Sequence, residues 1–246
     1  MGRKVPADAL RHMSFAIVGG FFGAYAILGP SGVFGNAQTV NLLQLLFDSL
    51  FGQWSSLLLH VGALLCYIVG VISAVLLRKK YNRDTGRISP IITAVCAILL
   101  DFLPSGLSPM VYLYPIFFAM SFQWTAFTGA CGFNSATIFS TNNVKQASVG
   151  FAEYLCDGDR SHLRRTVFFG LTLLSFHLGA ALAFGAIKWS PIHPTWFALP
   201  LLLLSYASVV YEERVAEAAT VDVAAAEIAA MEETAEAMQA ELPTVE

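Results

Sequence analysis

Long apolar segments separated by short polar connections run along most of the chain, and their lengths give the first structural prediction. A helix needs about 20 predominantly apolar residues to cross the hydrocarbon core of a bilayer. Six segments approach or reach that length, and we predict six spans: 13–28, 54–77, 88–103, 110–129, 166–187 and 195–211. The first, third and sixth are short, and Gly29-Pro30 and Pro104 mark strong helix ends beside two of them.

Two parts of the chain about a hundred residues apart carry the same features in the same order. Each has an aromatic helix end, a break rich in Gly, Asn and Thr, and later a His-x-Gly-Ala motif. The ranges are 22–25, 32–41 and 60–63 in the first part, and 124–127, 130–143 and 177–180 in the second. Three spans per half make the second half cross in the opposite sense, as in an inverted repeat. We therefore predict an all-α membrane protein of six transmembrane helices in two inverted three-helix repeats, with broken or amphipathic helices after spans 1 and 4.

Composition and charge agree with this assignment. With 56% hydrophobic and 13% charged residues and a mean hydropathy of +0.63, the chain is too apolar for a soluble domain. No small-residue cleavage site follows the basic N-terminus, so we expect the first apolar segment to be retained rather than cleaved as a signal peptide. The four cysteines, Cys66, Cys96, Cys131 and Cys156, lack metal-ligand spacing, and we expect them to be packing residues.

The distribution of basic residues predicts the orientation. We divide the chain into an N-terminus (1–12), a first repeat (13–104), a second repeat (105–211) and an acidic tail (212–246). Thirteen of the fourteen Lys and Arg then lie on one side of the membrane, and only Lys188 lies on the other. The positive-inside rule places both termini in the cytoplasm, in a multi-pass protein of the inner or plasma membrane.

The two breaks hold most of the polar side chains near the predicted spans. In the segment after the first break, Asn41, Gln44 and Asp48 share one helical face, and Gln146 and Glu153 are similarly spaced after the second. Such segments are either broken helices that direct amides into a protein-lined pathway or amphipathic helices at the headgroup level, and periodicity leaves both open. The candidate solute-binding residues are Asn36, Gln38, Thr39, Asn41, Gln123, Thr141, Asn142 and Asn143.

Three ionisable residues inside predicted spans are candidate proton or ion sites. His60 and His177 occupy equivalent positions in the two His-x-Gly-Ala motifs. Histidines inside a membrane can carry protons near neutral pH, although a packing role fits the sequence equally well. Asp101 is the one carboxylate deep in a single apolar span, and it is either a proton site or an interfacial residue beside Pro104.

The sequence contains no enzyme signature. A Gly-rich phosphate loop, a His-Glu-x-x-His zinc motif and a nucleophile elbow are all absent from it. We therefore expect no catalytic activity, no cofactor, no metal and no nucleic-acid partner.

The tail after residue 211 differs from the rest of the chain. It has ten acidic residues against Arg214, so the overall charge of -3 conceals a basic membrane part. A heptad-like seam runs along it through Val221, Ala224, Ile228, Met231, Ala235, Met238 and Leu242. The seam fits either pairing with a second copy or a solvated Ala/Glu-rich helix.

Residues 14 to about 210 resemble the YoaK-like family of uncharacterised bacterial multi-pass membrane proteins. The resemblance rests on the stretches 19–25, 32–36 and 39–41 and on the later echo at 141–143. It implies a multi-pass membrane fold and no particular activity.

We expect a transporter or channel for a small polar solute or ion; the alternative is a non-transporting scaffold or accessory subunit. The expected partners are the lipid bilayer, a small solute, and a second copy of the chain bound through membrane helices or the tail.

Overall fold

The computed structural model describes residues 6–29, 32–104 and 106–240 and is almost entirely helical. The prediction of an all-α protein is confirmed, since the two strands have two residues each and form a small antiparallel pair. In chain order the elements are α1 (Ala7–Leu28), α2 (Thr39–Leu50), α3 (Trp54–Lys79), α4 (Thr85–Asp101), η1 (Val111–Leu113), α5 (Tyr114–Ala126), β1 (Gly129–Ala130), β2 (Phe133–Asn134), α6 (Thr141–Asp157), α7 (Arg160–Trp189), η2 (Pro194–Phe197) and α8 (Ala198–Ala240).

Among the described residues, four helices are long and apolar enough to cross a membrane: α1, α3, α7 and the segment containing η2 and α8. Several such helices indicate a membrane protein. The third and fourth expected spans correspond to α4 and α5, which have only 17 and 13 residues. These two helices fall short of or just reach the 17–25 residues usual for a span, so the count of six spans stays a prediction.

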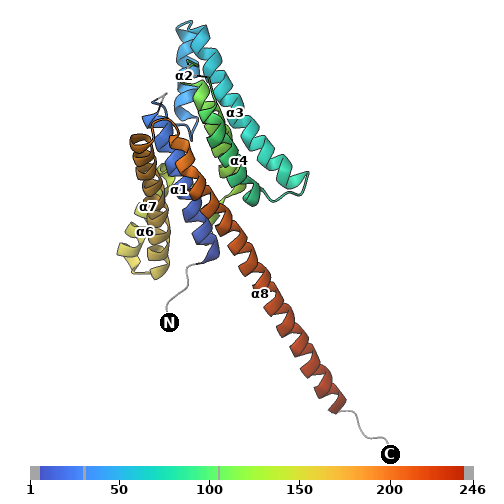
Figure 1. Cartoon of the computed structure of the whole chain (residues 1–246). Helices are drawn as coiled ribbons and strands as arrows, with labels where there is room; N and C mark the ends of the chain where they lie inside the picture. The colour runs from blue at the N-terminus through green and yellow to red at the C-terminus, as the bar shows by residue number, and fades with distance from the viewer. Residues whose placement is uncertain (1–5, 30–31, 105, 241–246) are drawn as a thin grey trace, which may run out of the picture.

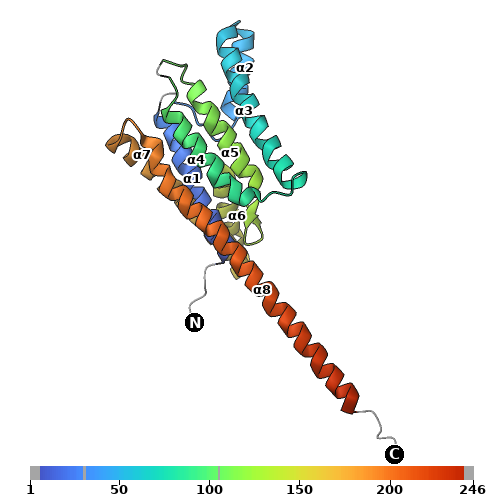
Figure 2. The ribbon, with the colours of Figure 1, turned by 45° about the vertical axis from the view of Figure 1, so that its right-hand side comes forward.

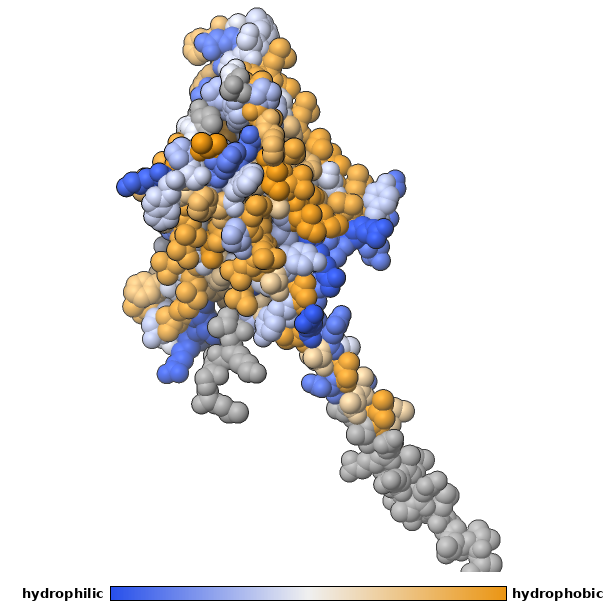
Figure 3. Space-filling model, in the orientation of Figure 1, coloured by the Kyte–Doolittle hydropathy of each residue, from blue (hydrophilic) through white to orange (hydrophobic). Residues whose placement is uncertain are grey.

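Helix α1 is the centre of the bundle. Within its most apolar stretch 67% of the residues are buried, against 22% in α3 and 28% in α7. Phe15, Phe21 and Phe22 are fully enclosed on α1. The outer helices instead expose many large apolar side chains, which cover most of the visible face of the bundle in Figure 3. Such a surface suits contact with lipid rather than water.

The helices of the two sequence halves pack across one another (Figures 1 and 2). The first helix of the first half, α1, lies along α7, and the first helix of the second half, α5, lies along α3. In the same way α8 packs against α1, and α4 packs against α5. The last helices of the two halves, α4 and α8, also contact each other. Neither half therefore forms a closed unit by itself.

Glycines permit these cross-half contacts at close range. A Cβ atom on Gly179 of α7 would lie 1.8 Å from the carbonyl oxygen of Ile17, and one on Gly20 of α1 would lie 1.8 Å from that of Phe176. Gly62 of α3 similarly faces the Tyr114 side chain at the start of α5. Gly62 and Gly179 are the glycines of the two His-x-Gly-Ala motifs, and each packs on the first helix of the other half. Small residues bring helix backbones together in membrane proteins in this way.

Aspartates cap the N-termini of α4 and α7. The Asp84 carboxylate accepts from the backbone N–H groups of Gly86 and Arg87, and Asp159 accepts from that of Ser161. These bonds satisfy N–H groups that have no partner within the helix. The bonds from Ser161 also lower the pKa of Asp159.

The acidic tail is continuous with the last membrane helix. α8 runs unbroken to Ala240 and leaves the bundle as a single projecting helix (Figure 1). The tail is thus helical as far as Ala240, and the seam side chains of Val221, Ile228 and Met231 are exposed. The side chains of Ala235 and Met238, and Leu242 as a whole, lie outside the described part. The pairing partner expected from the seam stays a prediction.

Replacing Gly179 by Ala should destabilise the protein by about 1–3 kcal/mol, because the new methyl group overlaps the α1 backbone. A Cβ atom on Gly170 of the same helix would have nothing within 4 Å, so Gly170→Ala is the matched control and should be neutral or slightly stabilising. Thermal unfolding in detergent measures both. Equal stability of the two variants would contradict the close α1–α7 contact.

Candidate functional site

The two breaks meet inside the bundle at the amide of Asn36. Its Nδ2 donates to the backbone oxygen of Gly19, at 2.7 Å, and to that of Ile138, at 2.8 Å. Asn36 is fully buried. Gly19 lies in the middle of α1, nine residues before its end at Leu28, or about 14 Å along the axis. The first break therefore folds back to the middle of α1, where it contacts the second break.

A second buried amide supports the same region. Gln123 on α5 donates through Nε2 to the Phe15 backbone oxygen at 3.1 Å and to Thr137 Oγ1 at 2.9 Å. Close approach is again required, since a Cβ on Gly19 would lie 2.1 Å from the Thr137 carbonyl oxygen. We call Gly19, Asn36, Gln123, Thr137 and Ile138 the junction. Two of its acceptors, Asn36 Oδ1 and Gln123 Oε1, are buried and have no hydrogen-bond partner among the described residues.

Each break leads from the junction into a helix that returns toward the surface. α2 begins at Thr39 and packs on α3, and α6 begins at Thr141 and packs on α7. The choice between broken and amphipathic helices stays a prediction; at Asn36 and Ile138 the irregular backbone of the two breaks is enclosed by protein. Irregular backbone at membrane depth is tolerated only in such surroundings.

A polar pocket of about 340 Å³ lies beside the start of α2. Half of its ten lining residues are apolar; the polar half consists of Asn41, Gln44, Ser56, His60 and Ser108, from α2, α3 and the segment before η1. A second hollow of about 550 Å³ between α3, α4 and α5 is lined by apolar, aromatic and cysteine side chains, many of them on the lipid-facing surface. The first pocket is therefore the candidate site for a polar solute.

Asn41 and His60 of the pocket lining form a compact group with Asp48, which lies behind the lining, and we call these three residues the first triad. Asn41 Oδ1 lies 2.7 Å from His60 Nδ1, and Asn41 Nδ2 donates to Gln38 Oε1 and to the His60 backbone oxygen. On the other side of the ring, His60 Nε2 lies 3.7 Å from Asp48 Oδ2. The side chains of His60 and Asp48 are only 12% and 6% exposed. An amide and a carboxylate thus bracket the imidazole.

Gln146 and Glu153 of α6 and Arg165 of α7 form a second group, the second triad, which again consists of an amide, a carboxylate and a base. Arg165 donates to Gln146 Oε1 and, at 3.0 Å, to Glu153 Oε2. His162 also contacts Glu153, at 3.1 Å. This group is more open, with Arg165 27% and Glu153 42% exposed.

A third network fixes the second break. His12 Nε2 lies 2.9 Å from Ser135 Oγ, which donates to Asn143 Oδ1, and Asn143 Nδ2 donates to the Ala136 backbone oxygen. His12, Ser135 and Asn143 are all buried. Asn143 therefore holds the backbone of the break rather than lining the polar pocket. His12 is absent from the residues predicted from sequence because it precedes the predicted first span.

Several sequence candidates lie apart from both the junction and the pocket. Thr39 and Thr141 are exposed at the starts of their helices, and Asn142 is only partly buried, with a 3.4 Å contact to Gln146. His177 is exposed on α7, where its Nδ1 contacts the Leu173 backbone oxygen at 2.7 Å. The equivalence of His60 and His177 seen in sequence does not extend to their surroundings.

Asp101 belongs to a separate contact at the end of α4. Its side chain is 6% exposed, and its Oδ2 lies 3.1 Å from Thr195 Oγ1 and 3.2 Å from His193 Nδ1. The imidazole of His193 stacks on Trp196. Asp101 therefore joins α4 to η2 instead of standing free beside Pro104.

The described residues contain no cluster of His, Cys, Asp and Glu arranged to hold a metal ion. All four cysteines are free, and the expectation that all are packing residues is wrong for Cys131 and Cys156, which are exposed. Cys131 sits in a turn that Asp8 approaches, and partial burial and Asp8 raise the pKa of its thiol, which disfavours a reactive thiolate.

Comparison with protein-family models finds one described as "Protein of unknown function (DUF1275)", which matches residues 12–208. No curated protein and no solved structure is significantly similar to the chain. YoaK is itself a member of that family, and the narrower YoaK-like assignment stays a prediction. The match covers both breaks, the junction and the two triads but not the tail. The chain belongs to the DUF1275 family of uncharacterised proteins.

Proposed function

We propose that this protein is a small transporter or channel for a polar solute or ion, built from two inverted repeats. The observation that carries the proposal is the meeting of two breaks at the Asn36–Ile138 hydrogen bond, level with the middle of α1. Broken helices whose ends meet near the membrane midplane form solute and ion sites in many secondary transporters.

The exchange of helix contacts supports the inverted repeat. The four helices of the first half, α1 to α4, correspond in order to α5 to α8 of the second. Under this correspondence the contact α1–α7 becomes α5–α3, α1–α8 becomes α5–α4, and α2–α3 becomes α6–α7. The contact α4–α8 becomes itself. A two-fold axis in the membrane plane relates the halves of an inverted repeat in this way.

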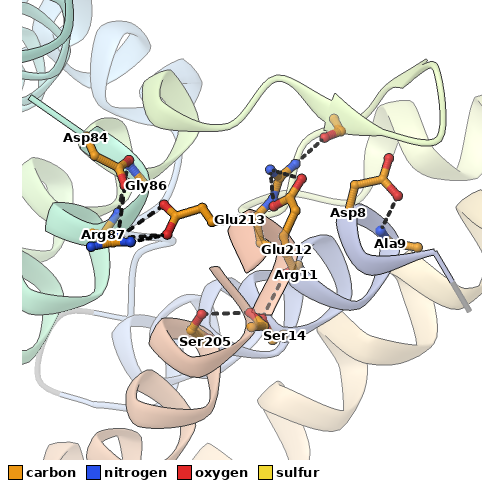
Figure 4. A network of polar contacts seen from close by, with 12 residues as sticks. Asp8, Ala9, Arg11, Ser14, Asp84, Gly86, Arg87, Ser205, Glu212 and Glu213 are labelled. Atoms are coloured by element: carbon orange, nitrogen blue, oxygen red, sulfur yellow. Dashed lines mark hydrogen bonds and ion pairs between the residues drawn. The ribbon is translucent and has the colours of Figure 1, made fainter. Parts of the chain in front are cut away.

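The ends of the bundle differ in a manner that suits alternating access. At one end the polar pocket opens beside α2. At the other end, Arg11 of α1 binds Glu212 of α8 and the Gly129 backbone oxygen, and Arg87 of α4 binds Glu213 (Figure 4). These ion pairs tie α1 and α4 to the exit of α8. We propose that the pocket end faces outward and the ion-paired end faces the cytoplasm, in the inner or plasma membrane.

The alternative function is a membrane scaffold that recruits a partner through its acidic helical tail. The projecting part of α8 supports it, because its described side chains are exposed, both the apolar ones of Val221, Ile228 and Met231 and the acidic ones of Glu217, Asp222 and Glu227. We also propose that the protein is not an enzyme, because its sequence carries no Gly-rich phosphate loop, zinc motif or nucleophile elbow. The pocket would have no role in a scaffold, so ligand binding there separates the two functions.

Topology should follow the distribution of basic residues. In a cysteine-free background, a cysteine introduced at Asn82 should react only from the cytoplasmic side, and one introduced at Pro191 only from the outside. Membrane-impermeant maleimide on intact cells measures both. Labelling of position 82 from outside would exclude the six-span arrangement.

Loss of the Asn36 amide should destabilise the protein strongly. Asn36→Leu removes the amide donor of the Ile138 oxygen and the extra bond to Gly19, whose carbonyl keeps its partner within α1, and an unpaired buried group costs about 1–3 kcal/mol. Asn134→Leu, at an exposed position in the second break, is the control and should change stability little. Thermal unfolding in detergent compares the two, and similar values would mean that the junction is not the anchor inferred here.

A ligand of the pocket should stabilise the protein in a way that a pocket substitution removes. We would screen a panel of small metabolites and inorganic ions by thermal shift, where a ligand at a hundred times its Kd adds about 2.7 kcal/mol. Ser56→Leu narrows the pocket and should abolish the shift, whereas Ser55→Leu, at an exposed neighbouring position outside the pocket lining, should preserve it.

Uptake of the identified ligand into proteoliposomes then tests transport itself. A pocket ligand that is taken up by wild type and by Ser55→Leu, but not by Ser56→Leu, is the expected result. Failure of the whole panel to stabilise wild-type protein, or binding without uptake, would favour the scaffold.

A further inference from the structure

We propose that Asn41, Asp48 and His60 form a proton-binding site beside the polar pocket, which Asn41 and His60 line, and that this proton is the coupling ion of transport. The coupling rests on the function proposed above, whereas proton binding at the first triad stands independently of it.

The hydrogen bonds of Asn41 fix which ring nitrogen of His60 is protonated. Asn41 Nδ2 donates to Gln38 Oε1 at 2.6 Å and to the His60 backbone oxygen at 3.1 Å. Its Oδ1 is therefore the atom that faces the ring, and it accepts from His60 Nδ1 at 2.7 Å. In the neutral imidazole the proton is on Nδ1, and Nε2 carries a bare lone pair.

That lone pair faces a carboxylate. Asp48 Oδ2 lies 3.7 Å from Nε2 and has no hydrogen-bond partner among the described residues. Two acceptors facing each other in a buried site repel, and an unpaired buried charge is costly. A proton on Nε2 removes both penalties, because it converts the contact into an ion pair in which both ring nitrogens donate.

The second triad gives an independent reason to place a positive charge at His60. Its members Gln146, Glu153 and Arg165 follow Asn41, Asp48 and His60 by the same interval of 105 residues. In both triads the carboxylate residue lies 7 positions after the amide residue, and the basic residue lies 19 positions after the amide residue. In the second half, a permanently charged guanidinium therefore occupies the place that His60 occupies in the first.

The difference between the triads is the one that a proton site requires. Arg165 keeps its charge at all relevant pH values and is partly open to solvent, so its group is a fixed link between α6 and α7. His60 can gain and lose its charge, is largely buried, and lines the pocket through which a proton can arrive. The first triad thus links α2 to α3 as the second links α6 to α7, but with a base that can gain and lose its proton.

Few other ionisable groups on the packed elements compete for this role. Asp48 is the only acidic or basic residue of α2, and α5 has none. On the elements packed against α3, the Tyr114 hydroxyl of α5 donates to the Leu59 backbone oxygen, and the Tyr112 hydroxyl of η1 donates to the Pro104 backbone oxygen. On α3 itself lie Cys66 and Tyr67, and Arg78 and Lys79 are at its far end. On α4, Arg87 pairs with Glu213, and Asp101 contacts Thr195 and His193.

Protonation of the first triad would act on the pocket through α2. The ion pair joins Asp48 of α2 to His60 of α3, and α2 also supplies Val40, Asn41 and Gln44 to the pocket lining. Loss of the proton replaces attraction by repulsion and loosens α2 from α3. The shape of the pocket therefore depends on the proton, which is the requirement for coupling.

The direct test is a histidine titration of the full chain in lipid nanodiscs. Isotope-labelled histidine NMR should show His60 gaining a proton on Nε2 as the pH is lowered, with its signal assigned by its loss in His60→Arg. Asp48→Asn should weaken this proton binding about tenfold or more, since a carboxylate partner favours the charged ring. His177→Gln is the matched control and should leave the His60 titration unchanged.

A second measurement uses a variant expected to fold. His60→Arg reproduces the residue type of the second triad and keeps the ion pair with Asp48. If the folded protein holds the proton, the stabilisation is full at low pH and falls as the pH rises, and His60→Arg should remove this part of the pH dependence of thermal unfolding. An unchanged pH profile in His60→Arg, or a His60 titration that Asp48→Asn does not move, would overturn the proposal.

Failure of the transport function would look different. His60 titrating as described in a protein that transports no solute would leave the proton site in place and remove its coupling role. A transported solute together with a non-titrating His60 would remove the proton site and leave the transport function.

Discussion

The amide of Asn36 is the contact on which the rest of the arrangement depends. A break in a helix exposes backbone groups that lipid cannot satisfy, so the break must find donors and acceptors within the protein. Asn36 supplies one donor group to Gly19 in the middle of α1 and to Ile138 in the second break. This single side chain sets the depth at which α2 begins and ties it to the break that precedes α6.

Packing around α1 follows from the same constraint. The breaks reach the middle of α1 only because Gly19 leaves room for the Thr137 carbonyl, and α7 reaches α1 only because Gly20 and Gly179 leave room for backbone. Close contacts of this kind favour van der Waals packing, which replaces the hydrophobic effect as the source of helix association in lipid.

The two triads have the same residue spacing and lie between corresponding helices, but they differ in the basic residue. Each joins a half-length helix to the following long helix through an amide, a base and a carboxylate. Arginine in the second triad carries a permanent charge, and on our proposal histidine in the first gives a link beside the polar pocket that responds to protons. Burial adds to the difference, since a proton matters most where water cannot screen the charges.

The sequence by itself determined the membrane class, the helical content and the position of both breaks, because long apolar runs and Gly/Asn-rich interruptions are local properties of the chain. It also indicated the duplicated order of features. The tertiary structure decided which polar residues meet. Sequence matching paired His60 with His177, yet the contacts give Arg165 the place corresponding to His60, because the register of each helical hairpin, not its His-x-Gly-Ala motif, sets which side chains face one another. The equal spacing of the two triads was present in the sequence, but only the folded hairpins show that those spacings bring an acid and a base together.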